Sequence, residues 1–266
     1  MRQTTFDRST IERRACRRII SLSTTISGIV NNFRSSSPAV GIAVVFGASG
    51  GIGSALAHQL REDKYFDRVI GFSRSSEPAI DLLNETSLRE AAIFAATQGE
   101  IRLVLDATGF LHDKIQRPEK SWRDLDYHQM ARSFALNTIG PALIMKHMLP
   151  LLPRQGKAIF ATLSARVGSI SDNRLGGWYS YRASKAALNQ LVRTASIELR
   201  RRQPEAICVA LHPGTVDTRL SSSFSKADLD VQSPDVAAKR LLAVVAGLRT
   251  GHSGGFFDQR GAPIPW

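Results

Sequence analysis

From residue 40 onward, short apolar runs alternate with longer stretches in which apolar residues recur every three or four positions. The short runs predict β-strands and the longer stretches predict amphipathic helices. Strands are expected at residues 40–46, 68–72, 79–83, 101–105, 157–163, 206–211 and 255–258. Helices are expected at residues 54–61, 85–97, 125–152, from 178 to beyond 197, and 235–248. This alternation predicts an α/β chain with one doubly wound parallel sheet, the Rossmann fold, over residues 39–266.

Two segments depart from a regular alternation. Only residues 73–78 separate the second expected strand from the third, too few for a full crossover helix, so the third strand is expected to be abbreviated. Within residues 125–152, Asn137 and Gly140 interrupt the helical pattern. Asparagine is unfavourable inside a helix and often bends it or frees a carbonyl, although a solvent-facing asparagine fits the pattern equally well.

Residues 1–38 form an Arg- and Ser-rich extension that we expect to be disordered. They are poor in acidic residues and end in a serine run before Pro38. Such a composition is also typical of an organellar transit peptide, so targeting to a mitochondrion or plastid is the alternative to a cytoplasmic location. An extension without function explains the segment as well.

The net charge of +12 raises the question of nucleic-acid binding. Residues 1–38 carry seven arginines against two acidic residues, or 7 − 2 = +5, which leaves 12 − 5 = +7 for the rest. Part of that remainder is the run at residues 200–202, where cations complement the dipole at a helix C-terminus. No basic stripe is interleaved with aromatic residues, so we expect no nucleic-acid partner.

The apolar runs and the cysteines further limit the class of protein to which this chain can belong. No run approaches the ~18 apolar residues of a membrane span, so no membrane partner is expected. The two cysteines cannot form a disulfide framework, and Cys208 lies in an apolar run, which favours a buried thiol and a reducing compartment. No metal ligand is assigned.

A glycine-rich turn follows the first expected strand. Gly47, Gly51 and Gly53 lie between that strand and the helix at 54–61. Glycines let the backbone approach a pyrophosphate, whose charge is stabilised at the helix N-terminus. Glycine also occurs in any tight turn, but this position between strand and helix favours a dinucleotide site.

The end of the second strand bears on the choice of dinucleotide. An NAD-binding unit places Asp or Glu ~20 residues past the glycines, whereas this chain has Arg74. An arginine can bind a 2′-phosphate through charge-assisted hydrogen bonds, which favours NADP(H) over NAD(H), although a solvated loop arginine is the alternative. Asp81 and Leu82 are suited to contact an adenine edge.

Tyr181 and Lys185 are spaced four residues apart on an expected helix. They therefore project from one face, where a fixed ammonium would lower the pKa of the phenol. Such a phenol can exchange a proton with an alcohol or carbonyl near neutral pH. The same spacing also arises by chance on exposed helices.

Together these motifs resemble the short-chain dehydrogenase/reductase family, within it the C-factor-like and sniffer-like carbonyl reductases. The resemblance rests on Ser169-Ile170, the Tyr-Arg-Ala-Ser-Lys-Ala-Ala-Leu-Asn segment from Tyr181 to Asn189, and the His-Pro-Gly turn ending at Gly214. It covers residues 40–266.

The resemblance implies a role for each matching residue. The implied cofactor contacts are Gly47, Ser49, Gly51, Ile52, Gly53, Arg74, Asp81, Leu82, Ala107, Gly109, Tyr181, Lys185, Pro213, Gly214, Val216 and Thr218. Tyr181 would be the general acid/base, Lys185 would bind the nicotinamide ribose, and Asn137 would hold a water that links the lysine to solvent.

The serine that orients the substrate in this family has no direct counterpart. Its usual position, three residues before Gly168, is Ala165 here, and Ser164 is adjacent. Neighbours in an extended chain point to opposite faces. Either the turn is shifted so that Ser164 serves as the catalytic serine, or this hydrogen bond is absent, which typically costs ~10²–10³ in rate.

The resemblance implies an NADP(H)-dependent oxidoreductase that interconverts a small-molecule carbonyl and an alcohol. A cofactor-binding signalling or redox-sensor protein with little turnover is the alternative, motivated by Ala165. Phe110, the 166–179 loop with Trp178 and a lid at 219–233 are expected to line the substrate pocket. By analogy with the family, a homodimer or homotetramer is expected.

Overall fold

The computed structural model describes residues 41–218, 220 and 231–266. The extension at 1–38 and most of the expected lid at 219–233 lie outside the described residues.

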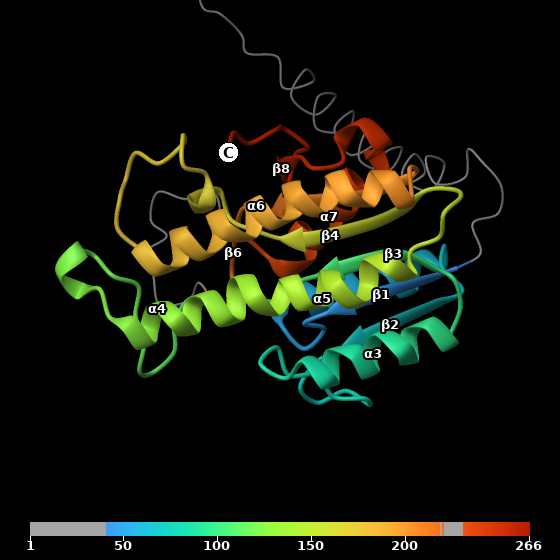
Figure 1. The fold of residues 1–266 in the computed structure, drawn as a ribbon, viewed down its shortest axis with the longest axis horizontal. Helices are drawn as coiled ribbons and strands as arrows, with labels where there is room; N and C mark the ends of the chain where they lie inside the picture. Colours follow the sequence, from blue (N-terminus) through green and yellow to red (C-terminus); the bar gives the residue numbers. More distant parts are fainter. Residues whose placement is uncertain (1–40, 219, 221–230) are drawn as a thin grey trace, which may run out of the picture. The chain divides into compact units, whose positions relative to one another are not determined.

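Six parallel strands form the central sheet in the order β2-β1-β3-β4-β5-β8 (Figure 1). Their bounds are β1 Ile42–Phe46, β2 Arg68–Phe72, β3 Ile101–Asp106, β4 Ala158–Leu163, β5 Ala206–His212 and β8 Phe256–Asp258. In the register of β1, Phe46 lies opposite both Phe72 and Asp106. The central strands are buried on both faces, which is why their sequences are nearly continuous apolar runs. The predicted doubly wound parallel sheet is confirmed.

Helices cover the sheet in two groups. Their bounds are α2 Gly51–Asp63, α3 Glu85–Thr97, α4 Tyr127–Phe134, α5 Gly140–Met148, α6 Tyr179–Arg202 and α7 Pro234–Gly247. One buried cluster joins α3, α5 and α6 to the sheet, through residues such as Leu88, Ile144 and Leu188. Helices α2 and α7 pack against each other outside that cluster. Alternate strand residues such as Ala43 and Val45 also lie outside it. Side chains alternate along a strand, so the two groups cover opposite faces.

The strand predicted at residues 79–83 does not form, and that prediction was wrong. The carboxylate of Asp81 accepts a hydrogen bond from the backbone N–H of Leu83, 2.9 Å away, and Asn84 caps α3 by accepting from the N–H of Thr86. Such side-chain bonds to the nearby backbone favour turns over strands. β2 is therefore the edge of the sheet.

The helix predicted at 125–152 is interrupted where the sequence indicated. A π-helical turn, η2 Ala135–Ile139, separates α4 from α5, and Asn137 lies in it. Asn137 is fully buried, so the solvent-facing alternative is wrong. Single π turns often occur at functional sites, because the extra residue redirects a side chain.

Candidate active site

The carboxyl ends of β1, β3, β4 and β5 bring the predicted site residues together. The turn after β1 is fixed first: the N–H groups of Gly47 and Ala48 donate to the carbonyl of Phe72, at 2.9 and 3.0 Å. Gly47 has a φ of +79°, and a Cβ on Gly53 would lie 2.2 Å from the carbonyl oxygen of Gly47. Both positions therefore require glycine, one for its backbone angle and one for the close approach.

The N-terminus of α2 is open for an anion. Its cap residue, Gly50, makes no side-chain hydrogen bond, and no acidic residue lies in the first turn that contains Gly51 and Ile52. Ser49, Gly50 and Gly51 are exposed. An uncapped helix N-terminus with exposed N–H groups fits the pyrophosphate of a dinucleotide.

Two further segments reach this turn. A Cβ on Gly51 would lie 2.8 Å from the methyl carbon of Thr218, and a Cβ on Gly47 would lie 2.9 Å from the carbonyl oxygen of Ala107. The structure thus brings Thr218 and Ala107 to the glycine turn, as the resemblance implied.

Arg74 follows the end of β2 and is exposed. It lies two residues beyond Phe72, whose carbonyl accepts from the glycine turn, so the backbone that carries Arg74 follows directly from the segment bonded to that turn. Asp81 uses one carboxylate oxygen in its own turn, and Leu82 packs against Gly140, where a Cβ would lie 2.9 Å from that of Leu82. The adenine contact of Asp81 and Leu82 stays a prediction.

Asn137 ties the strand ends to α6. It exchanges two hydrogen bonds with the backbone of Phe110, accepting from its N–H and donating to its carbonyl, both at 2.7 Å. Its amide also donates to the hydroxyl of Ser184, at 3.2 Å, and that hydroxyl donates to the carbonyl of Tyr181. Asn137 therefore fixes the backbone at Phe110 relative to the helix that carries Tyr181 and Lys185.

Lys185 is buried, and its amino group donates to the carbonyl of Leu163 at 2.9 Å. A Cβ on Gly109 would lie 3.7 Å from both the Lys185 Nζ and the Asn137 Oδ1, so the three residues converge. Burial lowers the pKa of Lys185 to about 8, while the charge of Asp106 acts in the opposite direction. The lysine still carries its charge at neutral pH.

Tyr181 is half-buried one turn before Lys185, and its ring makes an edge contact with that of Trp178, with centroids 6.2 Å apart. Burial raises the pKa of Tyr181 above its ordinary value. The expected lowering by Lys185 is therefore wrong for this structure, in which the ammonium is bonded to the carbonyl of Leu163 and burial dominates.

Asp106 is fully buried beneath the site. Its carboxylate accepts from the N–H and hydroxyl of Thr108, at 3.0 and 2.6 Å, and from the hydroxyl of Thr162, at 2.7 Å. Burial raises the pKa of Asp106, and these hydrogen bonds oppose the shift. The hydroxyls satisfy a carboxylate that would otherwise be costly to bury.

The hydroxyl of Ser164 is directed at α6. It donates to the Oδ1 of Asn189 at 2.7 Å, and the amide of Asn189 donates to the carbonyl of Gly168 at 3.4 Å. Ser164 and Asn189 are both buried, and Ala165 begins the short turn η4 Arg166–Gly168.

Glu119 is a residue of the site that the sequence did not reveal. It is buried in the connection between β3 and α4, and its carboxylate accepts from the N–H of Ser180, at 3.2 Å, and from the Ser180 hydroxyl. Its backbone carbonyl accepts from Trp178 at 2.6 Å. A carboxylate is favourable at a helix N-terminus, and this one lies at the start of the helix that carries Tyr181. The contact spans 61 residues, so no local pattern could indicate it.

Of the expected pocket residues, Phe110 lies beneath the guanidinium of Arg132, 4.4 Å from the ring centroid, and Trp178 lies beside Tyr181. In the turn after β5, Pro213 accepts a hydrogen bond from the side chain of Gln232. Within the described ranges, no helix is long and apolar enough to cross a membrane. The same residues contain no group of three or more His, Cys, Asp or Glu arranged to hold a metal ion.

Comparison with known proteins shows likenesses over most of the chain. Residues 78–242 match the family model described as enoyl-(acyl carrier protein) reductase. The chain is 42% identical to the C-signal protein of Myxococcus xanthus over 54% of this chain and 82% of that protein. It is 30% identical to 1-hydroxy-2-glutathionyl-2-methyl-3-butene dehydrogenase of Rhodococcus sp. (strain AD45), over 84% of this chain and 98% of that protein.

Solved structures share the fold. The NADPH-bound carbonyl reductase from chicken fatty liver superposes with a TM-score of 0.75 at 25% identity, covering 85% of this chain and 94% of that one. The carbonyl reductase Sniffer of D. melanogaster gives a TM-score of 0.72 at 22% identity, covering 85% and 98%. The second likeness concerns the fold alone.

Proposed function

The chain belongs to the short-chain dehydrogenase/reductase family of nicotinamide-dependent oxidoreductases, and from that premise we propose that it interconverts a carbonyl and an alcohol with NADP(H). The observation that carries the proposal is the convergence at Gly109, where the Lys185 Nζ and the Asn137 Oδ1 each lie 3.7 Å from the site of a Cβ. The same helix presents Tyr181 one turn away.

Several residues are placed to hold the cofactor. The open N-terminus of α2 suits the pyrophosphate, and Thr218 and Ala107 border it. The charged Lys185 suits the nicotinamide ribose, and the turn at Pro213, Gly214 and Val216 suits the nicotinamide. The bound cofactor supplies or accepts a hydride, and the protein supplies position and field.

Tyr181 is proposed as the proton donor and acceptor for the substrate oxygen. Because burial raises the pKa of Tyr181, the phenol is protonated at neutral pH and is suited to donate in the direction of carbonyl reduction. Asn137 maintains the position of this group through Ser184, which links it to the carbonyl of Tyr181.

Tyr181→Phe tests the reaction directly. The substitution removes the hydroxyl and keeps the ring beside Trp178, so NADPH binding is expected to persist while turnover falls by about two to four orders of magnitude. Oxidation of NADPH with a panel of aldehydes, ketones and quinones measures turnover, and NADPH fluorescence measures binding. Turnover equal to that of the wild type would refute the mechanism.

Arg74 is proposed to select NADP(H). It is exposed and lies two residues beyond Phe72, the residue bonded to the glycine turn, so its long side chain is within reach of a 2′-phosphate bound there. The carbonyl reductase from chicken fatty liver, which is 25% identical to this chain, has been solved with NADPH bound, which supports this choice.

Arg74→Ala is expected to weaken NADPH binding about tenfold and to leave NADH binding unchanged, because only NADPH carries the phosphate. Parallel titrations with both nucleotides measure the effect, with Arg117→Ala as a control that removes an arginine far along the chain from the glycine turn. A wild type that prefers NADH would contradict the assignment.

One observation favours the second candidate, a cofactor-binding signalling or sensor protein. Ser164, the hydroxyl nearest in sequence to the expected substrate-orienting position, is bonded to Asn189, and position 165 has no polar side chain. The relation to the C-signal protein of M. xanthus fits this alternative. Tight NADPH binding without turnover on any substrate class would favour it over the enzyme.

A further inference from the structure

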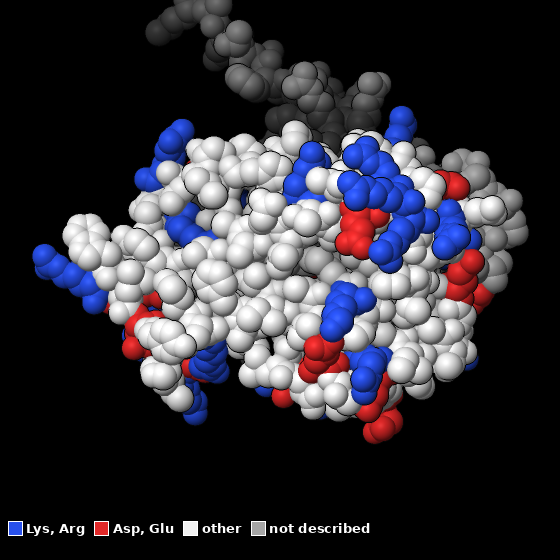
Figure 2. All heavy atoms as spheres, in the orientation of Figure 1, with Lys and Arg blue, Asp and Glu red and all other residues white. Residues whose placement is uncertain are grey.

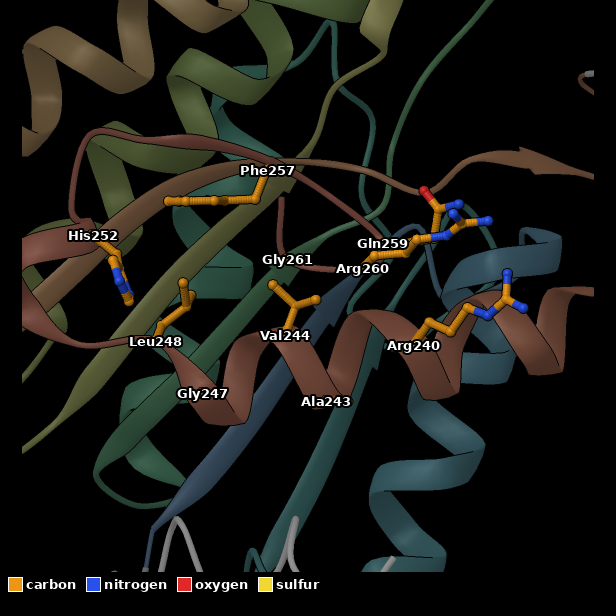
Figure 3. A pocket seen from close by; sticks show the side chains of 10 residues that line it. All are labelled: Arg240, Ala243, Val244, Gly247, Leu248, His252, Phe257, Gln259, Arg260 and Gly261. Carbon is orange, nitrogen blue, oxygen red and sulfur yellow. The ribbon is translucent and has the colours of Figure 1, made fainter. Parts of the chain in front are cut away.

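A second concave site lies apart from the catalytic residues, between α7 and the chain segment around β8 (Figure 3). Its volume of about 570 Å³ is within the range of small-molecule pockets. Figure 3 shows Leu248 and Phe257 with His252 toward one end, Val244 in the middle, and Arg240, Gln259 and Arg260 at the other end. The site therefore has an apolar end and a cationic, hydrogen-bonding end.

The cationic end retains its charge. Within the part of the chain that the structure describes, no carboxylate lies within 4.0 Å of the guanidinium of Arg240. Asp258, which lies in the chain between the lining residues Phe257 and Gln259, accepts with one oxygen from the backbone N–H groups of Arg260 and Ala262, at 2.9 and 3.0 Å. Its other oxygen lies 3.6 Å from Arg166. The carboxylate of Asp258 is thus occupied by other groups.

We propose that this cavity binds an amphiphilic anion, a medium-chain carboxylate in the simplest case, and that the bound anion weakens cofactor binding at the turn after β5. The head group would bond to Arg240 at the cationic end, and the chain would lie along Val244, Leu248 and Phe257. An arginine binds a carboxylate through charge-assisted hydrogen bonds, and the apolar end supplies a surface from which an alkyl chain excludes water.

A chain of hydrogen bonds connects the cationic end to the turn after β5. The guanidinium of Arg240 donates to the Oε1 of Gln232 at 2.8 Å, and the Nε2 of Gln232 donates to the carbonyl of Pro213 at 2.5 Å. A Cβ on Gly214 would lie 2.7 Å from the Gln232 amide and 2.9 Å from the Gln259 amide. Gln259, which lines the cavity, and Gln232, which is bonded to the lining residue Arg240, therefore both pack against this turn.

A carboxylate that accepts from the Nη1 of Arg240, the atom that donates to Gln232, competes with Gln232 for this donor. The bond from arginine to a carboxylate is roughly twice as strong as the bond to a neutral amide, so the anion draws the guanidinium away from Gln232. Gln232 then remains bonded to Pro213 but is no longer held by Arg240, so the position of the turn is less fixed. This coupling rests on the proposed function, because it assumes that the turn holds the nicotinamide. Binding of the anion to the cavity does not rest on the proposed function.

Calorimetric titration of the full chain without cofactor tests the site, with decanoate, decyl phosphate, decanol and decyltrimethylammonium as probes. Decanoate is expected to bind one molecule per chain, decanol at least about tenfold more weakly, and the cation not at all. Decyl phosphate shows whether the head group can also be a phosphate. If decyl phosphate binds no tighter than decanol, the site is restricted to carboxylates. If decyl phosphate binds as tightly as decanoate, the site accepts amphiphilic anions in general.

Two variants and a matched control locate the binding. Arg240→Gln is expected to weaken decanoate at least about tenfold, whereas Lys239→Gln, which removes the same charge from the neighbouring exposed position, leaves it unchanged. Val244→Phe fills the middle of the cavity while Arg240 stays in place, and should also weaken decanoate. Equal losses in Arg240→Gln and Lys239→Gln, or decanol as tight as decanoate, would overturn the site.

NADPH fluorescence titrations with and without saturating decanoate test the coupling. NADPH is expected to bind about fivefold more weakly with decanoate, and linkage requires decanoate to weaken by the same factor with NADPH. Unchanged NADPH affinity overturns the coupling. If the wild type binds no decanoate and Val244→Phe changes the molar mass of the protein, the cavity belongs to a self-association surface, and the proposal is overturned. If Tyr181→Phe keeps full turnover, the proposed function fails, whereas the decanoate titration still decides the site.

Discussion

At the scale of single residues, the orientation of Asn189 decides what Ser164 does. The amide of Asn189 donates to the carbonyl of Gly168, and reversing the side chain would bring two oxygens together. Its Oδ1 must therefore face Ser164 and accept the hydroxyl proton. A hydroxyl that donates to Asn189 is not available to donate to a substrate oxygen. Of the two interpretations of Ala165, the geometry thus supports the one in which the hydrogen bond from a serine to the substrate oxygen is absent.

Ser164→Ala follows from this geometry. Turnover is expected to stay within about threefold of the wild type, far from the ~10²–10³ loss of an oxyanion donor. The unfolding free energy is expected to fall by about 1–3 kcal/mol, because the buried Oδ1 of Asn189 loses its donor. Steady-state kinetics and urea unfolding measure the two effects.

Ala165→Ser is the complementary variant. It adds a hydroxyl at the family position and is expected to raise kcat. A hundredfold loss of turnover in Ser164→Ala with normal folding would instead show that Ser164 contacts the substrate.

At the scale of elements, the N-terminus of α6 depends on a distant carboxylate. The cap residue of α6, Trp178, has a φ of +54° and makes no side-chain capping bond. Glu119 supplies that bond at Ser180, immediately before Tyr181. The start of the helix that carries Tyr181 is therefore positioned by a loop rather than by its own sequence.

Glu119→Ala is expected to lower the unfolding free energy by about 1–3 kcal/mol, because the buried N–H of Ser180 loses a charged acceptor. It should also reduce kcat while NADPH binding changes little, since α2 is not involved. The control is Glu205→Ala, just beyond the end of the same helix, which removes an exposed carboxylate. Substitution at such a surface position is expected to change the unfolding free energy by no more than about 0.5 kcal/mol. Equal effects of the two variants would contradict a capping role.

The elements also show which features the sequence could predict. The helix over Glu85–Thr97 was predicted with its observed bounds, because its apolar residues mark it clearly. The strand at 79–83 was predicted wrongly, since Asp81 and Ser87 bond to the local backbone, which an apolar count does not register. Glu119 and the Ser164–Asn189 bond depend on contacts between distant segments. Those contacts exist only once the sheet has brought strand ends and helices together.

At the scale of the whole molecule, charge is distributed unevenly over the helices. Figure 2 shows Lys and Arg gathered over the C-terminal end of α6, which carries Arg200, Arg201 and Arg202, and a largely uncharged surface over the middle of α5 and α6. A hollow of about 390 Å³ lies between the two helices, lined mainly by apolar residues such as Ala142, Leu149 and Leu191, with Lys146, Glu198 and Arg202 also in its lining. Its apolar part offers a surface for a second copy of the chain, as the expected homodimer requires.

Ala142→Glu tests this surface. Ala142 is half-buried in the hollow, and a carboxylate there would be desolvated against its symmetry mate in a two-fold interface. The molar mass is expected to halve, from tetramer to dimer or from dimer to monomer, as measured by light scattering after size-exclusion chromatography. Ala96→Glu makes the same change at an exposed position of α3 and should leave the mass unchanged. A wild type that is monomeric at all concentrations, or an unchanged mass in Ala142→Glu, would show that the α5–α6 surface is not the interface between subunits.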